Sequence, residues 1–195
     1  MSNLEKLVEY IKVKINEKHG FPFVISLDGG SGSGKTTIAS QLAHILRATT
    51  ISCDDFFAIH IPDHEWDDYP VEEKCRLCID WERVRKDAVL PLLTGNKAQY
   101  HPFSFSTMNG LSNDIVKLEP ANILILDGIY SSKWLLDVVD LTILVDVDVD
   151  IRRKRHNLRE NTEDIEWHNR WDSVEDYYFS TLRPLESFDI VFTNE

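Results

Sequence analysis

One short glycine-rich segment constrains this chain more than any other feature. Residues 29–36 read GGSGSGKT, and Gly29, Gly34, Lys35 and Thr36 fit the pattern G-x-x-x-x-G-K-[ST]. Glycines let the backbone wrap around an anion with its N–H groups pointing inward, and the following helix adds positive dipole there. A strand-like apolar run precedes the segment and a helix-like pattern follows it, as this loop requires. The sequence therefore predicts a nucleotide-phosphate site rather than a turn that binds nothing.

The expected roles within this loop follow from its chemistry. Lys35 would neutralise charge on the β/γ-phosphates, and the Thr36 hydroxyl would ligate Mg²⁺. The predicted cofactors are therefore ATP or GTP together with Mg²⁺, and no NKxD segment marks a GTPase. The full set of predicted nucleotide-binding residues is Gly29, Gly30, Ser31, Gly32, Ser33, Gly34, Lys35, Thr36 and Thr37.

Size, charge and cysteine usage limit the class of protein. A chain of 195 residues suits one α/β domain over 1–195, with room for a small lid. The net charge of −12 argues against a general nucleic-acid binder. No segment is apolar enough to span a bilayer or to act as a signal peptide. Cys53, Cys75 and Cys78 suit a reducing cytoplasm, and the last two are expected on a helix rather than at a zinc site. We expect a cytoplasmic protein with a small-molecule partner and no nucleic-acid or membrane partner; a homo-oligomer is one of the alternatives left open.

Apolar strands that alternate with helices predict a three-layer α/β/α architecture with a mostly parallel sheet. The expected strands are 23–27, 49–52, 123–126, 141–145 and 190–192. The expected helices are 3–18, 34–47, 81–90, 148–159 and 173–182. Residues 53–112 are expected to form a substrate-side region, in which 53–80 is loop rather than core and 99–112 is loop or short hairpin.

Asp127 is the predicted second residue of a metal site. It directly follows the apolar run NILIL, at the carboxyl end of an expected strand, where ligands gather in open α/β sheets. A carboxylate at that place holds Mg²⁺ directly or through water in related chemistry. The alternative is a buried aspartate that caps the following turn.

Several segments along the chain carry a family resemblance. They are GGSGSGKTT at 29–37, SCDDFF at 52–57, DGI at 127–129, VDVDVDIRRKRHNLR at 145–159, and the pairs Ser173-Val174 and Arg183-Pro184 with FDIV at 188–191. In this order they resemble the uridine kinase and phosphoribulokinase family, which also includes nicotinamide riboside kinases. The resemblance implies a P-loop NTPase fold with a small arginine-containing lid at about 152–170. It also implies transfer of the γ-phosphoryl group of ATP to a hydroxyl of a small molecule, with a nucleoside or nucleoside-like sugar favoured.

The same resemblance implies the catalytic residues. Asp54 matches the family's catalytic aspartate, which would accept the proton of the substrate hydroxyl and lie beside the metal held by Thr36 and Asp127. Its neighbour Asp55 is the alternative base. Lys35 would act on the phosphates in catalysis as well as in binding.

Three arginines share one face of the expected helix over 148–159. Arg152, Arg155 and Arg159 recur at i, i+3 and i+7. Taken alone, this pattern fits a solvated cationic face equally well. The resemblance favours catalytic roles for Arg155 and Arg159, which would gather on phosphate oxygens.

The acceptor side is implied by a weaker match. The predicted substrate-binding residues are Asp55, Asp80, Tyr100, His101 and Phe103. Asp80 is either a carboxylate for ribose hydroxyls or the N-cap of the next helix, and the aromatic residues either stack a ring or pack in the core.

The chain departs from the family at several positions of this side. Residues 106–109 read STMN where uridine kinases carry Thr-His-x-Arg, and His156 stands where arginine is common. A nucleotide-binding regulatory module of the same fold, without turnover, is therefore the competing hypothesis. A nucleoside monophosphate kinase is less favoured, because only Arg76, Arg83 and Arg85 lie between residues 53 and 130.

Overall fold

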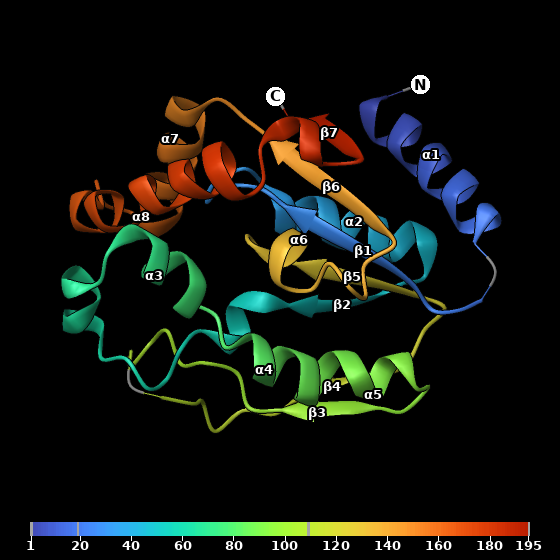
Figure 1. The fold of residues 1–195 in the computed structure, drawn as a ribbon, viewed down its shortest axis with the longest axis horizontal. Helices are drawn as coiled ribbons and strands as arrows, with labels where there is room; N and C mark the ends of the chain where they lie inside the picture. Colours follow the sequence, from blue (N-terminus) through green and yellow to red (C-terminus); the bar gives the residue numbers. More distant parts are fainter. Residues whose placement is uncertain (1, 19, 109, 195) are drawn as a thin grey trace.

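A central sheet of five parallel strands organises the computed structural model, which describes residues 2–18, 20–108 and 110–194 (Figure 1). The strand order is β2-β5-β1-β6-β7, and each neighbouring pair is parallel. The strands are β1 (Phe23–Asp28), β2 (Thr49–Ser52), β5 (Ile123–Asp127), β6 (Leu141–Asp146) and β7 (Ile190–Thr193). The predicted parallel sheet is confirmed.

Helices cover both faces of this sheet because successive side chains of each strand point to opposite sides. Ile25 of β1 is buried in one cluster with α1 (Asn3–Glu17) and α2 (Lys35–Leu46). Its neighbour Val24 is buried in a second cluster, with residues of α3 (Val71–Leu77) and α8 (Ile165–Tyr177). Both faces are thus apolar, which gives the three layers that the alternation of strands and helices predicts.

The region from residue 53 to residue 80 differs from the expectation of a loop outside the core. It contains the short helices η1 (Cys53–Phe56), η2 (Asp63–Asp68) and α3, and Phe56, Trp66 and Cys75 are completely buried. Two of these elements are 3₁₀-helices, which have three residues per turn and therefore leave no 3.6-residue pattern in the sequence. The prediction of loop was wrong here because the periodicity that it looked for does not exist in such turns.

The next helical segment also extends beyond its predicted end. It runs through α4 (Trp81–Arg83), a π-helical segment η3 (Val84–Val89) and α5 (Leu90–Leu93), and so passes Pro91. Proline lacks an N–H, but the hydrogen-bond register has already changed in the π-helical turn before it. The hairpin expected at 99–112 is wider: β3 (Ala98–Tyr100) pairs antiparallel with β4 (Val116–Leu118). Asn109 lies outside the described residues.

The last helices form the upper left of the molecule in Figure 1. The helix α7 (Val149–Glu160) begins after Asp148, whose side chain accepts a hydrogen bond from the Asp150 N–H. Its successor α8 begins at Ile165 rather than near residue 173, with Asp164 as its N-cap. The segment predicted as a lid, 152–170, therefore comprises most of α7 and the start of α8. The chain then continues through η4 (Tyr178–Leu182) and the short η5 (Leu185–Ser187) to β7.

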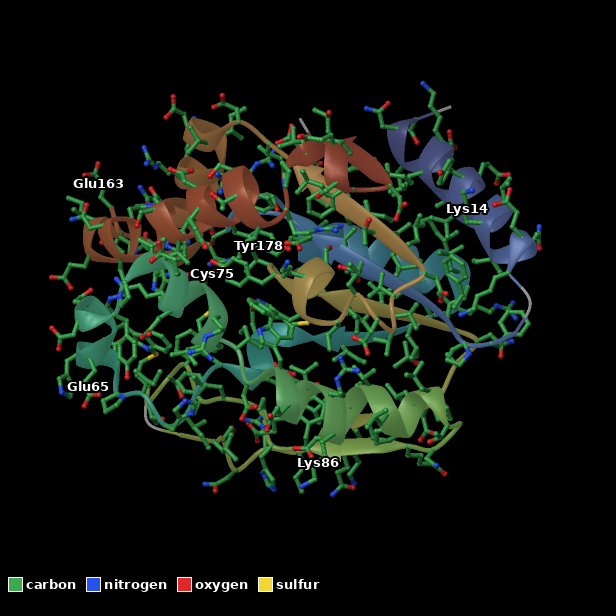
Figure 2. The ribbon with its side chains drawn as sticks, viewed as in Figure 1. Lys14, Glu65, Cys75, Lys86, Glu163 and Tyr178 are labelled. Atoms are coloured by element: carbon green, nitrogen blue, oxygen red, sulfur yellow. The ribbon has the colours of Figure 1, made fainter. Side chains whose placement is uncertain are left out.

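Side-chain placement follows polarity across the fold. In Figure 2, Lys14, Lys86 and Glu163 lie at the periphery, whereas Cys75 and Tyr178 lie between the helices and the sheet. All three cysteines are free thiols, and burial raises the pKa of the Cys75 thiol to about 12. Among the helices described, none is both long and apolar enough to cross a bilayer.

Candidate active site

The register of the central strands brings the predicted site residues to one edge of the sheet. Asp127 of β5 pairs with Ser52 of β2 on one side and with Leu27 of β1 on the other. The loop of residues 29–34 follows β1, and η1 follows β2, so both leave the sheet beside Asp127. In parallel sheets this carboxyl edge is where ligands bind.

The glycine-rich loop leads into α2 at Gly34, whose φ of 85° lies in the left-handed region that glycine adopts without strain. The first N–H groups of α2 have no partner within the helix and are directed to this edge. Lys35 lies over the loop, and its Nζ donates to the Gly30 carbonyl at 3.4 Å. Thr36 and Thr37 are exposed. This arrangement fits the phosphate groups of a nucleotide.

Asp127 is buried, with 5% of its surface exposed, and its Oδ1 has no hydrogen-bond partner in the described part of the chain. Burial raises the pKa of its carboxyl, and the Lys35 charge and the Thr36 hydroxyl partly offset that shift. An unpartnered carboxylate oxygen next to a threonine hydroxyl and a lysine fits a divalent cation that bridges to a phosphate. The N–H groups of the turn after β5 bond to a different aspartate. The hydrogen bonds therefore do not support the alternative role of Asp127 as the residue that caps this turn.

Asp28 is the residue that caps the turn after β5, and the sequence did not lead us to predict it. It is completely buried at the end of β1 and accepts hydrogen bonds from the N–H groups of Gly29 (2.8 Å), Tyr130 (3.1 Å) and Ser132 (3.3 Å). Burial raises the pKa of the Asp28 carboxyl, and these donors offset it only in part. Asp28 therefore joins the start of the phosphate loop to the turn after Asp127. A carboxylate at the end of the apolar run FVISLD was the available signal.

The two candidate bases have different surroundings. Asp54 is exposed at the start of η1, whereas Asp55 is half-buried and its Oδ2 accepts a 2.9 Å hydrogen bond from the Tyr100 hydroxyl. Burial raises the pKa of the Asp55 carboxyl, and Tyr100 partly offsets this effect. The structure thus brings two predicted acceptor-side residues, Asp55 and Tyr100, into contact with each other and leaves Asp54 accessible.

Arg83 holds the other acceptor-side residues together. Its Nη2 donates to the carbonyl oxygens of Asp55 (3.2 Å) and His101 (2.8 Å), and its guanidinium lies 4.7 Å from the centre of the Phe56 ring. Asp80 caps the same helix, since its Oδ1 accepts from the Arg83 N–H at 3.0 Å. The N-cap alternative for Asp80 is therefore what the structure shows, and its contact with a substrate stays a prediction. Arg83 was missed because its partners are backbone oxygens, which no sequence pattern reveals.

Aromatic side chains border this region. Phe57 lies at the centre, with its ring 5.1 Å from Phe103, 5.8 Å from Phe105 and 6.0 Å from Trp171 between centroids. Phe103 is 7% exposed and Phe105 is 52% exposed. Phe103 therefore packs in the core, as one of its two predicted alternatives has it, and Phe105 presents an accessible ring beside it.

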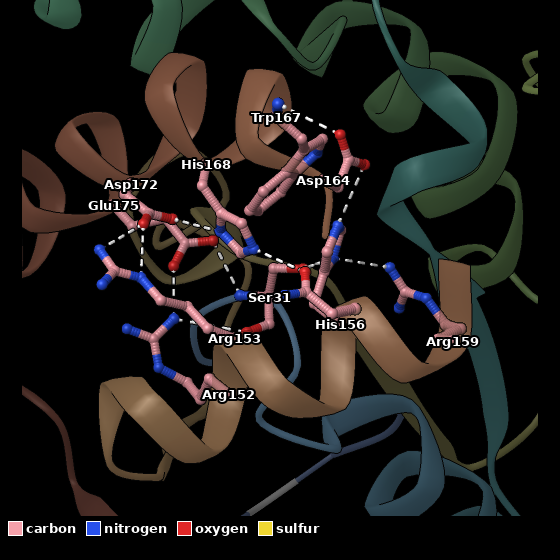
Figure 3. A network of polar contacts seen from close by, with 11 residues as sticks. Ser31, Arg152, Arg153, His156, Arg159, Asp164, Trp167, His168, Asp172 and Glu175 are labelled. Atoms are coloured by element: carbon pink, nitrogen blue, oxygen red, sulfur yellow. Dashed lines mark hydrogen bonds and ion pairs between the residues drawn. The ribbon is translucent and has the colours of Figure 1, made fainter. Parts of the chain in front are cut away.

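The three arginines that share one face of α7 have separate environments. Arg155 is half-buried and its Nη1 donates to the Asn194 carbonyl at 3.4 Å. Arg159 is exposed and contacts Glu160 at 2.7 Å. It also contacts His156 at 3.3 Å (Figure 3). Arg152 forms a buried ion pair with Glu175 at 2.6 Å. Arg155 and Arg159 thus make weak or exposed contacts, whereas Arg152 is paired with a carboxylate inside the protein.

The family of the chain follows from its similarity to known proteins. The family model for the phosphoribulokinase / uridine kinase family matches residues 24–164, which contain the glycine-rich loop, Asp54 and Asp127. The chain belongs to this family. Members of the family are P-loop kinases of small molecules, and the fold and the resemblance predicted from the sequence are both confirmed.

Individual relatives agree with that assignment. A uridine kinase from Halobacterium salinarum is 30% identical over 84% of this chain and 72% of its own length. One from Ligilactobacillus salivarius is 31% identical over 84% of this chain and 77% of its own. Among solved structures, a possible uridine kinase from Bacillus stearothermophilus superposes with a TM-score of 0.72 over 97% of both chains, at 23% identity. A D-glycerate 3-kinase from Cryptococcus neoformans, at 12% identity, has a TM-score of 0.58 over 96% of this chain and 89% of its own.

Proposed function

We propose that this family member transfers the γ-phosphoryl group of ATP to a hydroxyl of a nucleoside or nucleoside-like sugar. The observation that carries the proposal is the register of β2, β5 and β1, which places Asp54, Asp127 and the Lys35 loop at one edge of the sheet. The relatives that bear the name uridine kinase support an acceptor of this class.

In the proposed reaction the acceptor oxygen attacks the γ-phosphorus while its proton passes to Asp54. The bond from the γ-phosphorus to the bridging oxygen breaks, and ADP leaves with the bonding electron pair. Lys35, Arg155 and Arg159 would stabilise the negative charge on the phosphoryl oxygens. Thr36 and Asp127 would hold Mg²⁺, with Asp54 nearby, and the ion would supply further charge neutralisation on the phosphates.

The acceptor would lie between two kinds of side chain. Asp55 and Tyr100 offer a carboxylate and a phenol for sugar hydroxyls, and the accessible ring of Phe105 offers a surface for a planar base. The buried ring of Phe103 supports Phe105 from behind, with 4.9 Å between their centroids. These contacts favour a molecule with both a polyol and a flat ring.

A screen of nucleosides, vitamins and sugars with MgATP, read out as phosphorylated product by mass spectrometry, tests the proposal. We expect one nucleoside-like acceptor to give product far above the water background. Asp54→Asn should lower the kcat of the enzyme with that acceptor about 100-fold or more. Binding of MgATP, measured by calorimetry, should be retained. Asp55→Asn is the comparison variant for the choice of base. Because Asp55 is proposed to contact the acceptor, we expect this variant to raise the KM for the acceptor and to lower kcat less than Asp54→Asn does.

Two results would count against this assignment. If no acceptor gives product above the background, the chain binds nucleotide without transferring phosphate, and the proposal is wrong. If Asp55→Asn abolishes product formation and Asp54→Asn does not, the base is Asp55 and the role of Asp54 is wrong.

A further inference from the structure

The backbone N–H and C=O of Ser31, at the tip of the glycine-rich loop, are both hydrogen-bonded to side chains from outside the loop. Its N–H donates to Glu175 Oε1 at 2.8 Å, and its carbonyl oxygen accepts from Arg152 Nη1 at 3.4 Å (Figure 3). Arg152 Nη1 also donates to Glu175 Oε2 at 2.6 Å. One ion pair, with Arg152 from α7 and Glu175 from α8, therefore holds the two successive peptide groups that flank Ser31.

This ion pair is buried. The side chain of Glu175 is 6% exposed and that of Arg152 is 16% exposed. Burial raises the pKa of the Glu175 carboxyl, and the Arg152 charge, the Ser31 N–H and the Lys35 charge offset the shift in part. A buried ion pair loses the hydration of both charges, so it adds little net stability compared with an apolar contact. Its geometry, in which the two side chains bond the backbone N–H and C=O of one loop residue, points to a positional role instead.

Arg152 and Glu175 lie so close to the loop that only glycine fits at positions 30 and 32. A Cβ atom on Gly30 would overlap the guanidinium of Arg152 and would lie 2.6 Å from Glu175 Oε2. A Cβ atom on Gly32 would overlap the main-chain carbonyl of Arg152. The helix α7 and the loop are therefore in direct contact on either side of Ser31, and side chains at positions 30 and 32 would separate them.

We propose that Glu175 and Arg152 are positioning residues for the phosphate loop. By fixing the backbone N–H and C=O of Ser31, they keep the loop in its phosphate-binding shape before nucleotide arrives, and they attach α7 and α8 to it. The family model matches residues 24–164, and Glu175 lies outside this matched region. The inference rests on the proposed function in one respect, that the loop binds nucleotide phosphates.

The proposal separates Arg152 from the other two arginines of its helix face. Its guanidinium is occupied by Glu175 and by the Ser31 carbonyl, whereas Arg155 and Arg159 have only weak or exposed contacts. Arg152 is thus assigned to the loop itself, and contact with the transferred phosphoryl group is left to the other two.

Glu175→Gln tests the proposal, with Asp172→Asn as its matched control. Asp172 also joins α7 to α8, because Arg153 contacts it at 2.6 Å, but this pair is more exposed and is not bonded to the loop. Amide hydrogen exchange of the nucleotide-free protein is the first readout. In Glu175→Gln we expect the Ser31 amide to exchange about tenfold faster or more. Glutamine carries no charge and has one acceptor oxygen, so it cannot replace both carboxylate oxygens that bond the Ser31 N–H and Arg152. The amides of β1 and β5 should keep their rates in both variants.

Steady-state kinetics give the second readout. A loop that is no longer preorganised should raise the KM for MgATP about tenfold and leave kcat within about threefold. Arg152→Lys keeps a positive charge beside Glu175 and should give a smaller increase in both readouts. This variant carries the test if Glu175→Gln does not fold.

Two outcomes would overturn the proposal. One is a Ser31 amide that exchanges at the wild-type rate in Glu175→Gln and in Arg152→Lys. The other is an Asp172→Asn variant that accelerates exchange as much as Glu175→Gln, because helix packing alone would then explain the effect. The exchange experiment needs no nucleotide. A wild-type protein that fails to bind MgATP would therefore contradict the proposed function, while exchange at Ser31 would still decide this inference.

Discussion

The Tyr178 hydroxyl donates a 2.7 Å hydrogen bond to the Asp28 carboxylate, across 150 positions of the chain. Both side chains are completely buried. Asp28 immediately precedes the phosphate loop and also accepts from the turn after β5. One carboxylate therefore joins the loop, the turn beyond Asp127 and the start of η4, which directly follows α8.

Removal of the Tyr178 hydroxyl should destabilise the fold. Tyr178→Phe keeps the ring, which packs against Tyr130 at 4.8 Å between centroids, and deletes only the donor. We expect the free energy of unfolding to fall by about 1.5–3 kcal/mol, the usual range for a hydrogen bond to a charged group. Urea denaturation followed by circular dichroism measures it. Tyr177→Phe, next along the helix, is the control, and an equal loss there would contradict the assignment.

The contribution of Asp28 to stability should depend on pH in a defined direction. Burial raises its pKa above 3.8 in the folded state, so between 3.8 and the raised pKa the folded protein binds more protons at this position than the unfolded chain. The contribution is fully present below the unfolded pKa and is lost as pH rises through the folded pKa. The difference in unfolding free energy between wild type and Asp28→Asn should therefore shrink from pH 3.8 upward. A difference that grows with pH over this range would show that the pKa is lowered.

Asp127→Asn should weaken metal-dependent nucleotide binding. The unpartnered Oδ1 beside Thr36 would lose its charge, while the loop and Lys35 would stay in place. We expect the apparent affinity for Mg²⁺ in the presence of ADP to fall about 10- to 100-fold, as for changes around other metal sites. Calorimetric titrations of ADP with and without Mg²⁺ separate the two effects. Equal losses in both titrations would mean that Asp127 supports the loop and not the ion.

Arg155→Ala should reduce turnover more than binding. If its guanidinium reaches the phosphoryl group during transfer, its loss should lower kcat about 100-fold, as for one donor in other charge-stabilising sites. Arg153→Ala is the control on the same helix, because Arg153 pairs with Asp172 at the surface, and we expect its kcat to change less than about twofold. Initial rates with the acceptor found by the screen give both values. Similar rates for the two variants would remove Arg155 from the reaction.

The sequence predicted those parts of the fold that depend on neighbours along the chain. The apolar runs of β1, β5 and β6 are buried on both faces of a parallel sheet, so each appears as a short continuous apolar segment. The glycine-rich loop is contiguous, and its pattern indicated its place between β1 and α2. Asp127 was predictable because it ends a strand. The catalytic and binding roles of these residues stay predictions.

Other parts depend on contacts that the sequence does not display. The start of α8 was missed by eight residues, because its first half is polar and its apolar spacing is weak. Asp28, Glu175 and Arg83 were missed because their partners lie on other elements or on backbone atoms. A charged residue inside an element has no local mark that distinguishes a buried partner from a solvated face. Arg152 was ambiguous for the same reason until its contact with Glu175 was seen.

The outside contacts of the phosphate loop have a consequence for the order of synthesis. Glu175 binds the peptide at Ser31, and the Asn194 side chain donates to the Ser33 carbonyl at 2.8 Å. The loop is synthesised before the residues that hold it, which lie 144 and 161 positions further along the chain. A nascent chain that stops before α8 contains β1 and β5 but lacks both contacts. Nucleotide would therefore meet a fully shaped loop only after residue 194 has been translated.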